Sequence, residues 1–394
     1  MEVSVIVPVR NSIEWIDDCL ESILNQTAIG TISLEVCVYD DVSTDGSYLK
    51  LESWKKTFET EGIPMKLSRN TELEPGGVGY AKNRCIEQSS GEYLCFLDSD
   101  DVMKPERIEK QLKAASQYKD AIIGCQFSRH PYNSTLRYTR WANSLPPEKL
   151  EVQVLTSHGP TVIMPTWFCH RSVYDRVGGF TEVRKSHPED LVFFYKHLDL
   201  GGHIRRVDEV LLIYRYHPGA MTFGISEKTI WSLRVKRLEE NFILNWKSFY
   251  IWNAGKQGRQ LYRSISEISR KKVKGFCDVD ARKITQGYYT FEAEKQIPRP
   301  KIPIVHFNDG EPPFVICVKL VKGFCDVDAR KIAQGYYTFE AEKQIPRPKI
   351  PIVHFNDGEP PFVICVKLDM TNGELERNIE GLGLVENVDY VIFS

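Results

Sequence analysis

The sequence of 394 residues lacks three features that would each assign it to a class of protein. It has no apolar run close to the roughly 20 residues that cross a bilayer, so we expect no membrane span. It has no excess of positive charge, because 51 Lys and Arg face 53 Asp and Glu, and we therefore expect no nucleic-acid partner. No charged leader precedes the first strand-like run, Val3–Val9, which predicts a cytoplasmic protein.

The sequence also lacks a disulfide pattern. Its ten cysteines are spread singly, several of them in apolar runs such as those around Cys37, Cys95 and Cys317. A disulfide framework is typical of short secreted chains, so we interpret these residues as buried free thiols. The hydrophobic share of 42% is enough for a substantial core, and the length predicts two domains or one domain with an extension.

A tandem repeat occupies much of the last third of the chain. Residues 273–320 are followed at once by residues 321–368, and the two copies differ only at Thr285 against Ala333. Units of a solenoid diverge because each meets different neighbours, so near-identity argues against a solenoid. Two copies of one strand cannot occupy one position in a sheet, and we expect one copy to be a surface insertion.

Strand-like and helix-like stretches alternate through the first half. The expected strands are Val3–Val9, Leu34–Tyr39, Pro64–Ser68 and Tyr93–Leu97. Helices are expected from Asn11, where Asn11 and Glu14 fit a capping box, over Val78–Glu87, and from Pro105. Repeated strand–helix units predict a mainly parallel sheet that binds ligands at the carboxyl ends of its strands. Two acidic clusters, at 40–46 and 98–101, are expected at that edge.

We expect three parts along the chain: an α/β domain over residues 1–227, a helical linker over 228–247, and a smaller α/β domain over 248–394. In the last part, Asn253-x-Gly255-x-x-Gly258 resembles a dinucleotide-binding turn with its first glycine replaced, and Asp278 lies where an acid can contact ribose. The alternative is a folded domain without a nucleotide that serves in assembly, and we prefer it slightly.

The second acidic cluster has the residue types of a metal site. Asp98-x-Asp100, with Asp101 beside it, places carboxylates at the end of a buried strand. Their mutual repulsion is costly unless a cation or hydrogen bonds neutralise it. A hard divalent cation shared with substrate phosphates suits this arrangement. The alternative is a solvated acidic turn that begins the next helix.

Several motifs together resemble those of the family 2 glycosyltransferases of GT-A fold. They are the strand residues 4–8, the loop 40–46, the helix residues 79–83, the cluster 98–101, the pair Glu189-Asp190 and the segment 214–217. The resemblance spans roughly residues 1–225. It implies a GT-A α/β domain that moves a sugar from a UDP-sugar donor to a hydroxyl of a glycan or other acceptor with inversion, assisted by Mn²⁺ or Mg²⁺. The turn at residues 253–258 separately resembles those of Rossmann-like modules attached to sugar-modifying enzymes, which implies a Rossmann-like fold for the C-terminal part.

The resemblance also implies roles for individual residues. Asp41 would bind the nucleotide base, and Asp190 would be the catalytic base. The residues implied at the donor are Pro8, Asn11, Asp40, Asp41, Lys82, Asp98, Asp101 and Arg215, and those implied at the metal are Asp98, Asp100 and His217.

Some of these residues have equally ordinary explanations. Lys82 fits a solvated helix face as well as a donor contact, and Glu189 fits a helix-start charge after Pro188 better than a site residue. Trp141 and Trp167 could stack on a sugar, but we expect at least one in the core.

Two other functions compete with the transferase hypothesis. A non-catalytic sugar-nucleotide-binding or scaffold protein would need no base at Asp190. An NAD-dependent oxidoreductase in the C-terminal part is disfavoured by Asn253 in the turn and by the lack of a Tyr-x-x-x-Lys motif there.

Overall fold

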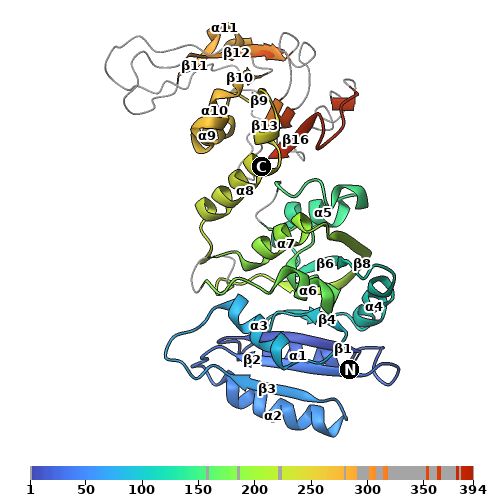
Figure 1. Ribbon diagram of the computed structural model, residues 1–394. Coiled ribbons are helices and arrows are strands. Elements are labelled where there is room, and N and C mark those ends of the chain that lie inside the picture. Colours follow the sequence, from blue (N-terminus) through green and yellow to red (C-terminus); the bar gives the residue numbers. More distant parts are fainter. Residues whose placement is uncertain are drawn as a thin grey trace. The chain divides into compact units, whose positions relative to one another are not determined.

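The computed structural model describes residues 2–156, 159–183, 187–220, 224–278, 281–290, 301–307, 314–317, 352–354, 362–364, 379–380 and 383–393. The chain forms two compact units, residues 1–154 with 158–230 and residues 155–157 with 231–394. The division falls inside helix α8 (Glu227–Asn241), close to the start of the predicted helical linker (Figure 1). No helix among these residues is long and apolar enough to cross a bilayer.

The N-terminal unit contains a mixed sheet of eight strands in the order β3-β2-β1-β4-β7-β6-β8-β5. These are β1 (Val3–Val9), β2 (Leu34–Asp40), β3 (Met65–Arg69), β4 (Tyr93–Phe96), β5 (Val102–Met103), β6 (Ala121–His130), β7 (Phe168–His170) and β8 (His203–Arg215). The half made of β3, β2, β1 and β4 is parallel, as predicted. In the other half β6 and β8 are parallel, but β7 and β5 pair antiparallel with their neighbours, so the sheet is less uniformly parallel than expected.

Helices follow most of these strands. They are α1 (Ile16–Leu24), α2 (Ser47–Thr60), α3 (Val78–Gln88), α4 (Arg107–Gln117), α5 (Leu136–Ser144), α6 (Arg171–Val177) and α7 (Glu189–Asp199). The predicted capping box at Asn11 is wrong, because α1 begins only at Ile16. Asn11 instead has a left-handed backbone with φ of 51°, and its backbone N–H donates to Ser43 Oγ at 2.9 Å.

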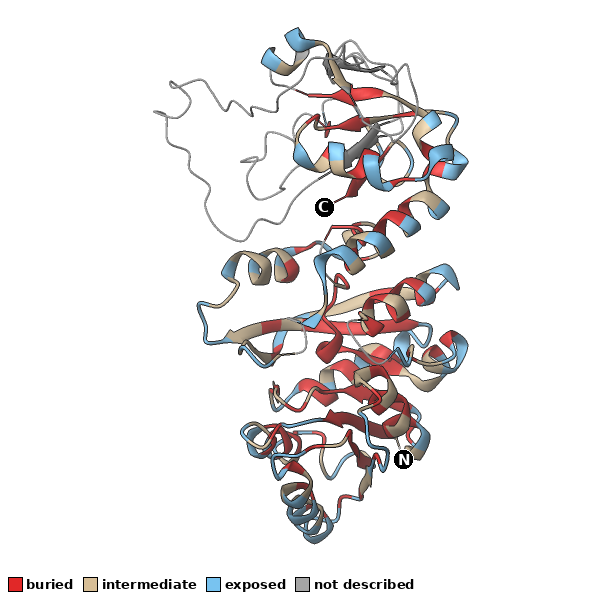
Figure 2. Ribbon diagram, turned by 90° about the vertical axis from the view of Figure 1, so that its left-hand side faces the viewer, coloured by how far each residue is buried: buried red, intermediate tan, exposed pale blue. Residues whose placement is uncertain are grey.

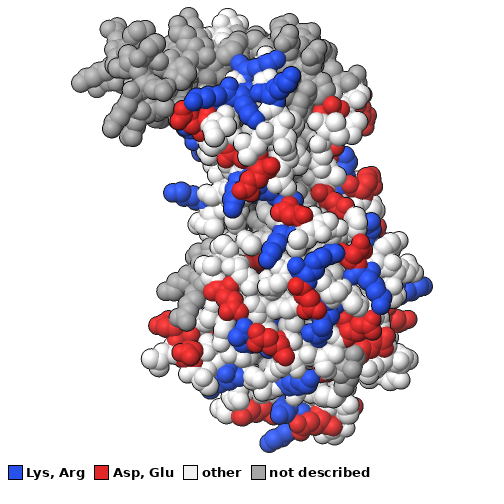
Figure 3. All heavy atoms as spheres, in the orientation of Figure 1, with Lys and Arg blue, Asp and Glu red and all other residues white. Residues whose placement is uncertain are grey.

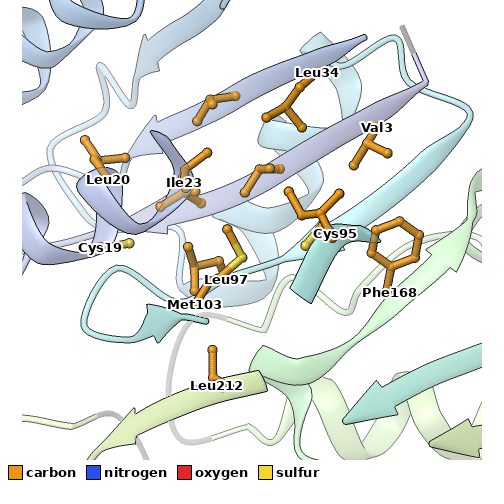
Figure 4. Packing of buried hydrophobic residues seen from close by; sticks show 14 of the residues in the cluster. Val3, Cys19, Leu20, Ile23, Leu34, Cys95, Leu97, Met103, Phe168 and Leu212 are labelled. Atoms are coloured by element: carbon orange, nitrogen blue, oxygen red, sulfur yellow. The ribbon is translucent and has the colours of Figure 1, made fainter. Parts of the chain in front are cut away.

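The core of this unit forms because β1 and β2 are buried along their whole length. Alternate residues of β1, including Val3 and Val5, pack with Leu20 and Ile23 of α1 in one apolar cluster (Figure 4). The intervening residues point to the opposite face of the sheet, where α3 contacts β1 and β2. Figure 2 shows the result, a buried sheet between helices with exposed outer faces. This packing fixes the carboxyl ends of the strands at one edge.

The C-terminal unit is a second α/β unit, whose described strands form a sheet in the order β11-β12-β14-β10-β9-β13-β16-β15. Its strands are β9 (Phe249–Trp252), β10 (Val273–Cys277), β11 (Tyr288–Thr290), β12 (Lys301–Phe307), β13 (Phe314–Cys317), β14 (Ile352–His354), β15 (Phe362–Ile364) and β16 (Tyr390–Phe393). Its helices include α9 (Lys256–Ser264), α10 (Glu267–Lys271) and α11 (Ala281–Gln286). The predicted strands Phe249–Trp252 and Val273–Cys277 are confirmed, and they pair in parallel.

Strands from both repeat copies take part in this sheet. β12 and β14 come from equivalent stretches and pair in parallel with each other. β13 and β15 are also equivalent, and their first residues, Phe314 and Phe362, both pair with Tyr250 and Tyr390. Because two strands cannot both occupy one position in a sheet, the expectation that one copy is a surface insertion stays a prediction. The rest of residues 321–368 lies outside the described residues.

Candidate active site

The carboxyl edge of the N-terminal sheet gathers the two acidic clusters, as predicted. Val9, at the end of β1, lies opposite Asp40 at the end of β2, and the N–H of Asp41 donates to Val9 O at 2.8 Å. On the other side of β1, the N–H of Leu97 donates to Ile6 O at 3.1 Å. Asp98 follows directly. The parallel pairing therefore places both clusters at one edge, although 58 residues of sequence separate Asp40 from Asp98.

A buried lysine joins the second cluster to the start of α7. Lys82 of α3 is 2% exposed, and its Nζ lies 2.9 Å from Glu189 Oε1 and 3.8 Å from Asp98 Oδ1. Burial disfavours the ammonium form, but Glu189 and Asp98 more than compensate and raise the pKa of Lys82. The solvated-face explanation of Lys82 is wrong. Glu189 does begin α7, as the helix-start explanation predicted, but it is buried and forms an ion pair with Lys82.

Asp190 stands next to this ion pair on the first turn of α7. Its side chain is half-buried, and its Oδ1 accepts a hydrogen bond from the N–H of Leu191 at 2.7 Å. The surrounding protein and the Glu189 charge raise the pKa of Asp190 to about 7, against the opposing effect of Lys82. A carboxyl group with this pKa can take up and release a proton near neutral pH, which is what a general base requires.

The position of α7 depends on a close contact between α3 and the segment before α7. A side chain added at Gly79 would come within 2.3 Å of Thr181 O and 3.2 Å of Glu189 Cβ. Asn83, one turn further along α3, accepts hydrogen bonds from the N–H of Phe180 and the hydroxyl of Tyr174 and donates to Phe180 O. These contacts hold the chain that leads into Asp190.

Asp98 and Asp100 present their carboxyl groups differently. Asp98 is 29% exposed, and burial is the main reason that its pKa rises to about 6. Asp100 is 22% exposed, and its Oδ2 lies 2.9 Å from His217 Nε2. The His217 ring packs at 5.0 Å from the Trp15 ring, which fixes its orientation. Two of the predicted metal-binding residues are therefore in direct contact with each other.

Asp101 differs from the prediction that it contacts the donor. It is completely buried, and its Oδ1 accepts a hydrogen bond from the N–H of Arg215 at 2.9 Å. Arg215 also donates from Nη1 to Asp100 O at 3.1 Å and forms an ion pair with Asp18. Asp101 and Arg215 therefore connect the end of β8 to the acidic cluster. A buried carboxyl group cannot reach a ligand from this position.

The nucleotide side of the predicted site is largely buried as well. Asp40 is completely buried and lies 3.1 Å from Arg69 Nε, so it supports the loop rather than facing a ligand. Asp41 is 2% exposed and accepts hydrogen bonds from Asn70 Nδ2 and from the N–H groups of Gly76 and Gly77. Its Oδ2 accepts only the Gly77 bond, which leaves one lone pair for a further donor.

The two remaining predicted nucleotide contacts sit close to this loop. Pro8 is buried opposite Tyr39, and Asn11 is exposed with its Oδ1 accepting from the N–H of Thr44 at 2.8 Å. Contact of Pro8, Asn11 and Asp41 with a nucleotide stays a prediction. Of the two tryptophans, Trp167 is 1% exposed and donates to Val162 O, so it belongs to the core.

The dinucleotide-like turn of the C-terminal unit is built around Asp278. This residue is 5% exposed, its Oδ2 accepts from the N–H of Ala254 at 3.0 Å, and it lies 2.5 Å from Lys283 Nζ. Asn253 Oδ1 accepts from the N–H of Gly255 at 2.7 Å. The Asp278 carboxylate therefore holds the turn itself, and the predicted ribose contact is not its role in this structure.

The charges on the molecular surface agree with the low net charge. On the face of the N-terminal unit in Figure 3, basic and acidic side chains are intermixed and form no field of one sign among the described residues. Within the same described ranges, no group of three or more His, Cys, Asp or Glu has the geometry to hold a metal ion by itself.

Sequence reasoning found most of these residues but missed their connections. The pairing of Lys82 with Glu189 joins two helices 107 residues apart, and no local pattern signals it. Arg129 of β6 was also missed. No strand was predicted over residues 121–130, so no signal in the sequence pointed to Arg129.

Comparison with known proteins finds similarity to glycosyltransferases over part of the chain. Residues 4–178 match the model of the family described as Glycosyl transferase family 2. A stretch of 108 residues is 36% identical to a poly(ribitol-phosphate) beta-glucosyltransferase of Bacillus spizizenii and covers 27% of this chain and 16% of that protein. A stretch of 254 residues is 28% identical to an uncharacterized glycosyltransferase of Rickettsia felis and covers 60% of this chain and 39% of that protein.

The chain thus spans well under two thirds of the length of these relatives. Among solved structures, Staphylococcus aureus TarS 1–349 in complex with UDP-GlcNAc is 21% identical, covers 68% of this chain and 71% of its own, and superposes with a TM-score of 0.48. A TM-score of this size supports no inference about function. The matched residues 4–178 lie in the N-terminal unit, which has an α/β fold.

Proposed function

We propose that the N-terminal unit is an inverting glycosyltransferase that moves a sugar from a nucleotide-sugar donor to an acceptor hydroxyl. The observation that carries this proposal is the convergence of Asp98 and Glu189 on the single cation Lys82. This contact brings the start of α7, and with it Asp190, to the acidic cluster at the carboxyl edge of the sheet. The family match of residues 4–178 supports the same reaction class.

Asp190 is the proposed catalytic base. Direct displacement at the anomeric carbon needs a carboxylate that takes the proton of the acceptor hydroxyl on the face opposite the leaving group. One such displacement inverts the configuration of the sugar. The raised pKa of Asp190, about 7, matches this task because its carboxylate is a stronger base than an ordinary surface aspartate.

Asp100 and His217 are the residues that fit Mn²⁺ or Mg²⁺. Both are partly exposed, and their side chains converge within 2.9 Å. Carboxylate oxygen and imidazole nitrogen suit divalent cations, and donor phosphates or water would complete the coordination. A bound cation supplies Lewis-acid stabilisation of the departing nucleoside diphosphate. Asp98 faces Lys82, so we assign it to electrostatic balance in the site, with ligation by Asp98 as the weaker alternative.

The donor is proposed to be a UDP-sugar. This choice rests on the resemblance of the loop 40–46 to the uridine-binding loop of family 2 enzymes, with Asp41 as the acceptor of a base N–H. The sequence, including residues 159–168 and the C-terminal portion, also resembles β-1,3-N-acetylglucosaminyltransferase-like proteins, which makes UDP-GlcNAc the first donor to test. The acceptor is left to experiment.

The test is donor hydrolysis by the full chain over a panel of nucleotide sugars, with Mn²⁺ and with EDTA. We expect release of UDP from one UDP-sugar, stimulated by the metal and suppressed by EDTA. Asp100→Ala is expected to weaken metal-dependent UDP binding, measured by calorimetry. Hydrolysis of no donor by a protein that binds UDP would favour the alternative, a non-catalytic sugar-nucleotide-binding or scaffold protein.

A further inference from the structure

The cations around the proposed active site differ in how far they are already paired. Lys82 contacts Glu189 and Asp98, and Arg215 forms an ion pair with Asp18. Each of these two cations therefore has a carboxylate partner within the protein. Arg129 has none among the residues that the structure describes.

Arg129 is held in place by aromatic rings alone. It stands near the end of β6, and its guanidinium carbon lies 3.9 Å from the centre of the Tyr214 ring. Phe127 and Tyr216 flank it at 5.3 Å and 5.7 Å. Its side chain is half-buried and, within the described part of the chain, makes neither a hydrogen bond nor an ion pair. Stacking orders a guanidinium group but uses none of its N–H donors.

The strand pairing places Arg129 beside the acidic cluster. Arg129 lies opposite Tyr214 in the parallel pair of β6 and β8. Tyr214 directly precedes Arg215, whose N–H donates to Asp101. The N–H of Tyr216 donates to His130 O at 2.8 Å, so the segment that contains His217 continues alongside the end of β6. The electrostatic effects agree, because the positive charge of Arg129 opposes the rise in the pKa of the buried Asp101.

Arg129 also lies on the side of the base. Tyr138 of α5 packs at 6.3 Å from the Phe127 ring, next to Arg129. Burial raises the pKa of Tyr138 to about 12, and the charges of Arg129 and Asp190 both act on it. The acceptor hydroxyl must meet the proposed base, Asp190, and the charges of Asp190 and Arg129 act on the same tyrosine, so we assign Arg129 to the acceptor side of the reaction.

We propose that Arg129 binds an anionic group, a carboxylate or a phosphate, of the acceptor. This inference rests on the proposed function. An ordered guanidinium with free N–H donors is suited to bidentate contact with an oxyanion. Arg129 has no ion-pair partner among the described residues, so an anionic ligand would neutralise its charge. A phosphate of the donor is the other oxyanion that Arg129 could bind, but we place the donor phosphates beside Asp100 and His217.

The experiment compares acidic and neutral acceptors. The probes are galactose 6-phosphate and methyl β-glucuronide against methyl β-galactoside, with the donor found by the hydrolysis panel. We expect the wild-type kcat/KM to favour the acidic acceptors by about 10-fold to 100-fold, the size of a charge-assisted contact. Arg129→Met is expected to reduce this ratio to about 1 and Arg129→Lys to retain part of it. Arg140→Met, which removes an exposed arginine of α5, is the matched control and keeps the ratio.

Two further readouts separate the possible failures. Calorimetry follows binding of galactose 6-phosphate, and of UDP, independently of turnover. A weaker UDP affinity in Arg129→Met with an unchanged acceptor ratio would assign Arg129 to the donor and overturn the inference. Equal preference of the wild type for acidic and neutral acceptors would also overturn it. Binding of galactose 6-phosphate that depends on Arg129, in a protein without turnover, would refute the transferase and retain the anion site.

Discussion

The two edges of the N-terminal sheet shift the pKa of carboxyl groups in opposite directions, downward for Glu35 and upward for Asp98 and Asp190. At the amino edge, Glu35 of β2 is 1% exposed and accepts hydrogen bonds from Ser4 Oγ, the N–H of Ser90 and the N–H of Gly91. Lys66 Nζ lies 2.8 Å from its other oxygen. Burial alone would raise the pKa of Glu35, but these partners lower it to about 2.

At the carboxyl edge, Asp40 and Asp41 are bound by Arg69 and by N–H groups, but Asp98 and Asp190 are not neutralised in this way. Burial raises the pKa of Asp98 to about 6 and that of Asp190 to about 7. One buried lysine, Lys82, serves this group of carboxylates. The difference is that Asp98 and Asp190 lack the set of internal donors that lowers the pKa of Glu35. The carboxyl edge keeps chemically reactive groups whose charge a ligand or proton can balance.

The largest expected effect is on turnover, at the carboxyl edge. Asp190→Asn removes the proposed base, and we expect kcat to fall about 10²-fold to 10⁴-fold. Donor affinity and the thermal midpoint are expected to stay the same or rise, because the variant loses a carboxyl group that is poorly solvated in the fold. Steady-state kinetics, UDP titration and thermal melts measure the three quantities. Turnover close to that of the wild type would remove Asp190 from the mechanism.

The next largest effect is expected on stability, when the buried cation Lys82 is removed from the carboxyl edge. Lys82→Met keeps a stem of similar length but leaves Glu189 and Asp98 without their counter-charge. We expect the free energy of unfolding to fall by about 3–5 kcal/mol, measured by urea denaturation.

A double-mutant cycle gives the control for that variant. The same loss should be much smaller when Glu189→Gln is already present, because the two side chains act as one pair. Lys82→Arg is expected to recover part of both stability and turnover. Additive losses from Lys82→Met and Glu189→Gln would contradict the pairing.

A smaller effect is expected at the amino edge, and on stability alone. Glu35→Ala leaves the N–H groups of Ser90 and Gly91 and the hydroxyl of Ser4 without their acceptor. We expect a cost of about 2–3 kcal/mol in the free energy of unfolding. Turnover at a temperature where the variant is folded should match the wild type. Lost turnover in a folded Glu35→Ala protein would show that the two edges are not independent.

The smallest expected effect is on the pH dependence of stability, which has opposite signs for Glu35 at the amino edge and Asp190 at the carboxyl edge. The pKa of Glu35 is lower in the fold than its ordinary 4.5, so its contribution to stability is present above that pH and lost as the pH falls toward about 2. The pKa of Asp190 is higher in the fold than its ordinary 3.8, so its contribution is lost as the pH rises toward about 7.

Thermal melts across pH measure this difference. From pH 4 to pH 7, Asp190→Asn should gain stability relative to the wild type. From about pH 4.5 down to pH 2, the stability advantage of the wild type over Glu35→Gln should shrink. Shifts of the same sign in both comparisons would mean that the edges do not differ as described.

The family resemblance and the strand pattern together predicted much of the carboxyl edge. Strand–helix alternation predicted the parallel strands β1 to β4, and their shared edge then followed from parallel pairing. The antiparallel β7 was not foreseen, because Phe168–His170 is short and carries no periodicity of its own. The start of α1 was misplaced for a related reason, since Asn11 bonds to residues of the 40–46 loop rather than to its own helix.

The sequence by itself determined which residue types lie at the carboxyl edge. Strand–helix alternation makes neighbouring strands parallel, and the buried apolar strands leave polar groups at their ends. The tertiary structure alone decided which of these groups face a ligand. Asp101 and Asp40 were taken up by Arg215 and Arg69, Lys82 was buried against Glu189, and Arg129 was placed on Tyr214. These outcomes depend on contacts between segments distant in the chain, and local sequence patterns carry no information about which distant side chain arrives.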